Sequence, residues 1–222
     1  MPGICYHAYF ATLVKDYLCL GMGKENVVNA FYEGNFIPDM FGKEGKKNTH
    51  MYKEYDYVFT VPDMEKIEQL CRPKFNNPIV LGIYTHLYLD DRFIREFLVP
   101  SFTWDVENGI ITNPKTGYTA TKKEFFGSKD SGLYGAYTSI NPLLIKECNL
   151  DINSIPETLG MSGISVYDQG RREQTWKDEL TKYLSQDIPY TGEVLDYREL
   201  TSKIREFALD LAIALSKLNL EF

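Results

Sequence analysis

The sequence lacks the segments by which several classes of protein are recognised. Its four cysteines are widely scattered without a Cys-x-x-Cys pair, which argues against a thiolate metal site and predicts reduced, buried thiols in a cytoplasmic protein. No apolar run approaches the roughly 18 residues needed to span a bilayer. The first residues, MPGICYHAYF, have neither the basic nor the apolar region of a signal peptide. The net charge is -7, and Lys and Arg form no dense stretch, so no nucleic-acid patch or lipid-docking surface is expected.

What the chain does contain is apolar material. Of its 222 residues 44% are hydrophobic and 14% aromatic, with 16 Tyr and 13 Phe. This is enough to fill a core, so global disorder is excluded. We expect a single domain spanning residues 1–222.

Apolar positions at helical spacing predict a mainly α fold. The segment 79–98 is apolar nearly all round at first, which is typical of a buried central helix. The last helix is expected to begin at Asp196 as N-cap, with Glu199 in the capping-box position. The predicted helices cover residues 5–18, 24–32, 63–71, 79–98, 133–148, 173–184 and 197–218.

Turn-forming residues predict the breaks between these helices. Gly34 is expected to end the second helix, and Pro38 to keep residues 35–39 non-helical. Residues 41–50 (FGKEGKKNTH) are expected to form a polar loop. Asn-Gly and Lys-Thr-Gly turn signals in 101–126 predict a small β-hairpin insertion, either a lid or a surface decoration. Residues 149–171, rich in Gly, Ser, Asn and Pro, predict a long irregular loop.

The chain has three histidines, and one of them lies in the apolar segment 79–98. His86 and Asp90 are four residues apart, so both side chains lie on one face of the helix. A carboxylate on an apolar face needs a partner, and no Lys or Arg lies on that face. A divalent cation would satisfy both groups. The alternative for His86 is a core histidine bonded to a backbone carbonyl.

Three further residues complete the candidate site. Asp39 follows a proline and His50 ends the polar loop, so the two could supply ligands from outside the central helix. Their alternatives are a backbone-capping aspartate and a solvated histidine. His7, at the end of the apolar stripe of the first helix, has three readings: a ligand of a second ion bridged by Asp90, a hydrogen-bond partner of a ligand, or a satisfied core histidine.

The motifs C-Y-H-A-Y-F-A (5–11), E-G-N-F-I-P-D (33–39), K-N-T-H (47–50) and L-G-I-Y-T-H-L-Y-L-D (81–90) occur in a characteristic order. In this order they resemble the zinc-dependent phospholipase C and S1/P1 nuclease superfamily, especially its small intracellular bacterial members with a phospholipase C/D-like domain. The pattern L-Y-x-x-Y-x-x-x-N-P-L-L (133–144) is also similar. The resemblance covers about the first two-thirds of the chain well. It implies a compact multi-helix phospholipase C/P1 nuclease-like fold.

The resemblance further implies that Asp39, His50, His86 and Asp90 hold one zinc ion, with His7 and Asp90 available to a second. Full members of the superfamily hold three zinc ions, using later histidines and a processed N-terminal Trp. This chain has no histidine after His86 and begins Met1-Pro2, so we expect one ion. Two imidazoles and two carboxylates suit zinc, with iron, manganese or nickel as alternatives.

These residues lead to two hypotheses. The first is a metal-dependent hydrolase of phosphate esters or diesters that uses a metal-activated water as nucleophile. In it Asp39 would act as the base, with His7 in support, and the ligand would be a small phosphate-containing molecule. Tyr84, Tyr88 and Tyr134 would line its pocket or, alternatively, pack structurally. The second is a non-catalytic, metal-stabilised ligand-binding protein or degenerate family member. A His-Asp phosphohydrolase is excluded, because no histidine is followed by Asp.

Overall fold

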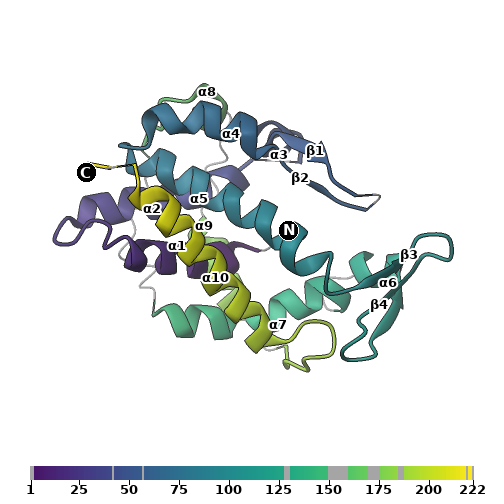
Figure 1. Ribbon diagram of the computed structural model, residues 1–222. Coiled ribbons are helices and arrows are strands. Elements are labelled where there is room, and N and C mark those ends of the chain that lie inside the picture. The colour runs from purple at the N-terminus through teal and green to yellow at the C-terminus, as the bar shows by residue number, and fades with distance from the viewer. Residues whose placement is uncertain are drawn as a thin grey trace.

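The computed structural model describes residues 3–41, 43–56, 58–127, 131–149, 160–169, 176–184, 188–218 and 220–221. It is mainly helical with two small antiparallel sheets, as the sequence predicts for the fold class (Figure 1). The longer helices are α1 (Ile4–Tyr17), α2 (Glu25–Phe36), α3 (Lys43–His50), α4 (Met64–Cys71), α5 (Pro78–Phe93), α7 (Gly132–Cys148), α9 (Trp176–Leu184) and α10 (Tyr197–Ser216). The shorter ones are η1 (Ile37–Asp39), η2 (Arg72–Lys74), the π-helical η3 (Ile94–Leu98), α6 (Lys122–Gly127) and α8 (Ser165–Asp168).

Helix α5 is the centre of the molecule. It packs against α1, α2, α4 and α10, and α1 in turn packs against α7 and α10 (Figure 1). Buried apolar side chains form one cluster that extends from Ile4 in α1 to Leu215 in α10. Any polar group on the inner face of α5 is therefore held deep in this core, as expected for segment 79–98. That segment is α-helical to Phe93 and then continues as η3.

Two glycines allow α2 and α5 to touch through their backbones. A Cβ atom on Gly34 would lie 2.0 Å from the carbonyl oxygen of Ile79, and one on Gly82 would lie 2.1 Å from that of Phe31. Only glycine fits at such distances. The prediction that Gly34 ends the second helix is wrong, since α2 continues to Phe36. The glycine serves the close approach of two helices instead.

The expectation of non-helical backbone around Pro38 is also wrong. Ile37 has φ -51° and ψ -46°, and Pro38 lies in the first turn of η1, where a proline's missing N–H costs nothing. The predicted polar loop 41–50 is largely helix α3. Its sequence KEGKKNTH has no apolar periodicity, and among residues 44–50 Thr49 and His50 are the buried ones.

The two sheets lie at one end of the molecule (Figure 1). Strands β3 (Thr103–Asp105), β4 (Ile110–Thr112) and β5 (Thr119–Thr121) form a three-stranded meander, so the insertion at 101–126 has one strand more than the predicted hairpin. Strands β1 (Tyr52–Glu54) and β2 (Thr60–Pro62) form a hairpin that the sequence analysis missed. Phe59 packs edge-on against Trp104, with 5.1 Å between ring centroids, and so joins the two sheets.

The last helix follows its prediction closely. The Asp196 side chain accepts a hydrogen bond from the Glu199 N–H at 2.8 Å, while the Glu199 carboxylate pairs with Lys115 instead of closing a capping box. The helix has an apolar stripe that is buried at Leu200, Ile204, Phe207, Leu211 and Leu215. Within the described residues, no helix is both long and apolar enough to cross a membrane.

Three predictions for the rest of the chain are confirmed only in part. Within the predicted irregular loop 149–171, residues 165–168 form helix α8, and residues 150–159 and 170–171 lie outside the described part. The helix predicted over 173–184 is described from Trp176 onward. Cys5 and Cys71 are buried free thiols, whereas Cys19 is exposed, against expectation.

Gly82→Ala tests the backbone contact between α2 and α5. The added methyl group would meet main-chain atoms of α2, which cannot rotate away, so the helices must separate. We expect a loss of about 3 kcal/mol in the free energy of unfolding, measured by urea denaturation. Gly127→Ala is the control, since among the described residues its Cβ would meet the Lys123 side chain alone, at 3.7 Å. Equal stability of the two variants would contradict the proposed role of Gly82.

Candidate metal centre

All five residues predicted for the site converge in the structure. His7 lies in α1, Asp39 at the end of η1, His50 at the end of α3, and His86 and Asp90 one turn apart in α5. Four of these side chains are at most 1% exposed, while that of Asp39 is 16% exposed. The alternative of a solvated His50 is therefore wrong.

The Asp90 carboxylate lies among the three imidazoles. Its Oδ1 is 3.3 Å from Nε2 of His7. Its Oδ2 is 3.3 Å from Nε2 of His50 and 3.6 Å from Nε2 of His86. The rings of His7 and His86 stack with 3.6 Å between centroids and 9° between planes. One carboxylate thus faces His7 with one oxygen and the other two histidines with the other.

Asp39 closes the other side of the cluster. Its Oδ1 is 3.7 Å from Nε2 of His50 and 4.0 Å from Nε2 of His86. Two groups of candidate ligand atoms therefore lie within 4.8 Å of one another: Asp39, His50 and His86, and His7, His86 and Asp90. Because His86 belongs to both groups, the two form one continuous centre.

Backbone carbonyls orient two of the imidazoles. Nδ1 of His86 lies 2.7 Å from the carbonyl oxygen of Asn35, and Nδ1 of His50 lies 3.0 Å from that of Lys46. A carbonyl only accepts hydrogen bonds, so each Nδ1 carries a proton while each Nε2 faces the centre. Metal-binding histidines are commonly held in this way. The contact of His86 fits both interpretations, a metal ligand and a core histidine, since a core histidine would also bond to a carbonyl.

Several polar atoms inside the centre lack hydrogen-bond partners among the described residues. Nε2 of all three histidines and both oxygens of Asp90 are buried and have no hydrogen-bond partner in the described part of the chain. Around a zinc ion with ligands at 2.0–2.1 Å, tetrahedral geometry separates ligand atoms by about 3.3–3.4 Å. The separations of 3.3–4.0 Å found here are close to this value. Each of the two groups, Asp39 with His50 and His86 and His7 with His86 and Asp90, therefore fits a divalent cation.

The electrostatics of the cluster favour the protonation states of metal ligands. Burial opposes ionisation of Asp39, but the nearby Lys46 and then the histidines outweigh it and lower the pKa of Asp39. Burial likewise opposes ionisation of Asp90, but His7 and His50 bring its pKa well below the ordinary value. Burial, and then His7, lower the pKa of His86 to about 3. At neutral pH both carboxylates are charged and His86 is neutral.

The sequence analysis missed three side chains close to this centre. Lys46 donates to Oδ1 of Asp39 at 2.6 Å. The ring of Tyr52 stacks on His50 at 5.0 Å, and burial, then Asp90 and Asp39, raise its pKa. Burial, then Tyr134 and Asp90, raise the pKa of Tyr137, whose hydroxyl is buried without a partner among the described residues. If residues 43–50 had been predicted as a helix, the i,i+4 spacing would have placed Lys46 one turn from His50.

Two of the three tyrosines for which pocket lining and structural packing were the alternatives pack away from the centre. Tyr84 contacts Phe75, with ring centroids 4.9 Å apart, and Tyr88 stacks on Phe10 at 6.3 Å. Tyr134 is 43% exposed. These contacts favour the structural reading of Tyr84 and Tyr88.

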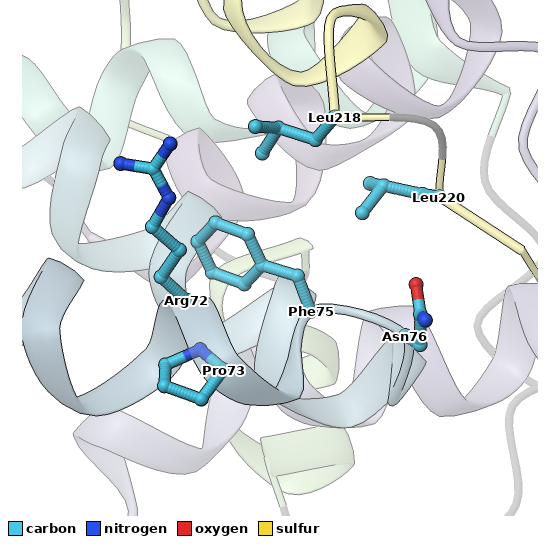
Figure 2. A pocket seen from close by; sticks show the side chains of 6 residues that line it. All are labelled: Arg72, Pro73, Phe75, Asn76, Leu218 and Leu220. Atoms are coloured by element: carbon cyan, nitrogen blue, oxygen red, sulfur yellow. The ribbon is translucent and has the colours of Figure 1, made fainter.

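A separate cavity of about 240 Å³ lies between η2 and the C-terminal segment (Figure 2). It includes none of the five site residues. Its one charged side chain, Arg72, already pairs with Glu68 at 2.9 Å. The cavity is lined by Arg72, Pro73, Phe75, Asn76, Leu218 and Leu220.

Comparison with known proteins adds no assignment to this geometry. No family model, no curated protein and no solved structure matches the chain. The resemblance to the phospholipase C and S1/P1 nuclease superfamily therefore stays a prediction, carried by the motifs that supply the five site residues.

The lowered pKa of His86 makes stability depend on pH in a testable way. Between pH 6.5 and about 3 the unfolded chain protonates this histidine and the folded chain does not, so acid favours unfolding. We expect the unfolding free energy of metal-free protein to fall between pH 6.5 and 4.5 by up to about 1.4 kcal/mol per pH unit from this one group. His86→Gln should flatten the slope, measured by urea denaturation with a chelator present. An unchanged slope would contradict burial of a neutral His86.

Proposed function

We propose that this protein is a metal-dependent hydrolase of phosphate esters or diesters, with zinc as its ion. The observation that carries the proposal is the convergence of three buried imidazole Nε2 atoms and two carboxylates, which form two overlapping groups of three whose ligand atoms lie within 4.8 Å of one another. A bound zinc ion supplies a Lewis acid and lowers the pKa of a coordinated water to about 7. Asp39, His50, His86 and Asp90 would hold it.

The roles of the protein's own groups follow from their positions. Asp39 is the partly exposed member of the cluster, so its carboxylate is the one that can take a proton from a nucleophilic water and pass it to solvent. His7 contacts Oδ1 of Asp90 and supports that carboxylate from the side away from His50. The hydroxyl of Tyr137, buried without a described partner, is a donor available to an anionic ligand.

The competing proposal is a non-catalytic, metal-stabilised protein. Four protein ligands complete a tetrahedral shell, which is typical of structural zinc, whereas catalytic zinc keeps a position open. What favours the enzyme is the exposure of Asp39 and its contact with Lys46, since a purely structural ion needs neither. The two proposals differ in whether Asp39 is required for turnover.

Asp90→Asn tests the metal centre. The amide keeps the shape of the carboxylate but removes its charge, so we expect wild-type protein to bind about one zinc ion per chain and the variant to bind at least tenfold more weakly. The measurement is elemental analysis after dialysis, with calorimetric titration. Asp91→Asn is the matched control, because this neighbouring carboxylate pairs with Arg95 at 2.6 Å instead. Near-zero metal in the wild type would end the proposal.

Asp39→Asn tests the chemistry. A screen of p-nitrophenyl phosphate, bis(p-nitrophenyl) phosphate and phosphatidylcholine with zinc or manganese should reveal turnover in the wild type. Loss of a general base typically slows a reaction 10²–10⁴-fold, so we expect a loss of at least about 100-fold. Asp91→Asn should keep full activity. A metal-loaded wild type that hydrolyses none of these substrates would favour the structural alternative.

A further inference from the structure

Among the five site residues, Asp39 is the one whose side chain is partly exposed to solvent. The side chains of His7, His50, His86 and Asp90 are at most 1% exposed, whereas that of Asp39 is 16% exposed and that of Lys46 is 36% exposed. A small ligand reaching the centre from solvent would therefore pass Asp39 and Lys46. This side is called the Asp39 face below.

Lys46 is tied to the centre at two points. Its backbone carbonyl accepts from Nδ1 of His50 at 3.0 Å, which fixes the position of its main chain beside the cluster. Its ammonium donates at 2.6 Å to Oδ1 of Asp39, the same oxygen that faces His50 and His86. The ammonium thus acts as a counterion at the spot where a divalent ion would contact Asp39.

An ammonium and a divalent ion on one carboxylate oxygen repel each other. Lys46 has a flexible four-carbon stem, so its ammonium can swing away while α3 and His50 stay in place. Displaced from Asp39, it remains on the Asp39 face, where its charge is complementary to an anion entering the centre. Lysine is a common phosphate-binding residue because its ammonium is a compact charge with three donors.

We propose that Lys46 is a counterion of the empty centre that moves to the anion when metal binds, so that metal and a phosphate group bind cooperatively on the Asp39 face. This inference rests on the proposed metal centre and assigns a residue for recognition of the phosphate group. It explains why the Lys46 ammonium contacts Asp39, a predicted metal ligand and the partly exposed member of the cluster.

The test uses Co(II) as a spectroscopic probe of the centre and inorganic phosphate as the anion. In Lys46→Met, Co(II) should bind about tenfold more tightly without phosphate, because no ammonium competes for Asp39. Phosphate, followed by the change in the Co(II) spectrum, should bind the loaded variant about tenfold more weakly than the loaded wild type. Lys46→Arg should retain most of the phosphate affinity.

Lys47→Met is the matched control. Lys47 is the next residue of α3, its side chain is 66% exposed, and it pairs with Glu44 at 3.1 Å. It should match the wild type in both affinities. Thermal melts should show all variants folded, since Lys46 lies at the surface.

The outcomes separate this inference from the proposed function. Equal affinities in Lys46→Met and wild type would overturn the role of Lys46 and leave the hydrolase proposal standing on Asp39. Tighter Co(II) binding with unchanged phosphate affinity would make Lys46 a counterion only, which also overturns the inference. Absence of Co(II) binding in the wild type would overturn the metal centre and this inference together. Since no turnover is measured, an inactive but phosphate-binding protein would still support it.

Discussion

The close backbone contact between α2 and α5 is the constraint on which the site depends. Gly34 and Gly82 let the two helices approach until carbonyl oxygens nearly touch the opposite backbone. At this separation the carbonyl of Asn35 reaches Nδ1 of His86 and fixes which nitrogen faces the centre. Asp39 follows four residues later in η1, so the same contact also sets how far its carboxylate lies from α5. Two residues without side chains therefore determine the geometry of the charged ones.

The second constraint is the charge that this geometry buries. Asp90 lies on a helix whose neighbouring positions, Leu87, Leu89 and Phe93, belong to the apolar core. An ionised carboxylate there needs compensation, and the neutral ring of His86 one turn away provides little of it. His86 is held neutral by burial, so protonation of that ring does not solve the problem. A bound cation would compensate the charge of Asp90, and its binding would stabilise the fold by mass action. With a cation bound there, the requirements of folding and of ion binding would coincide at this carboxylate.

The sequence predicts the parts of this arrangement that follow from periodicity. The buried α5, the i,i+4 pair His86 and Asp90, and the capped α10 all follow from apolar spacing and cap residues. It fails where tertiary contacts decide. Gly34 continues a helix because of a neighbouring backbone, and α3 forms without an apolar stripe, so no local pattern marks either. Lys46 was overlooked for the same reason. Its place beside the site depends on the helical turn that it shares with His50 and on its contact with Asp39.

The proposed function gives Asp39 two tasks, those of a metal ligand and of a base. Its contacts with Lys46, His50 and His86 all involve Oδ1 in the described part of the chain. Oδ1 thus faces the cation site, and the 16% exposed side chain can exchange a proton with solvent. No other carboxylate of the cluster has this freedom, because both oxygens of Asp90 are enclosed by imidazoles at 3.3–3.6 Å. A base must exchange its proton with solvent between turnovers, which a fully enclosed carboxylate cannot do quickly. The difference in exposure thus favours Asp90 as a permanent ligand and Asp39 as the group at which chemistry would occur.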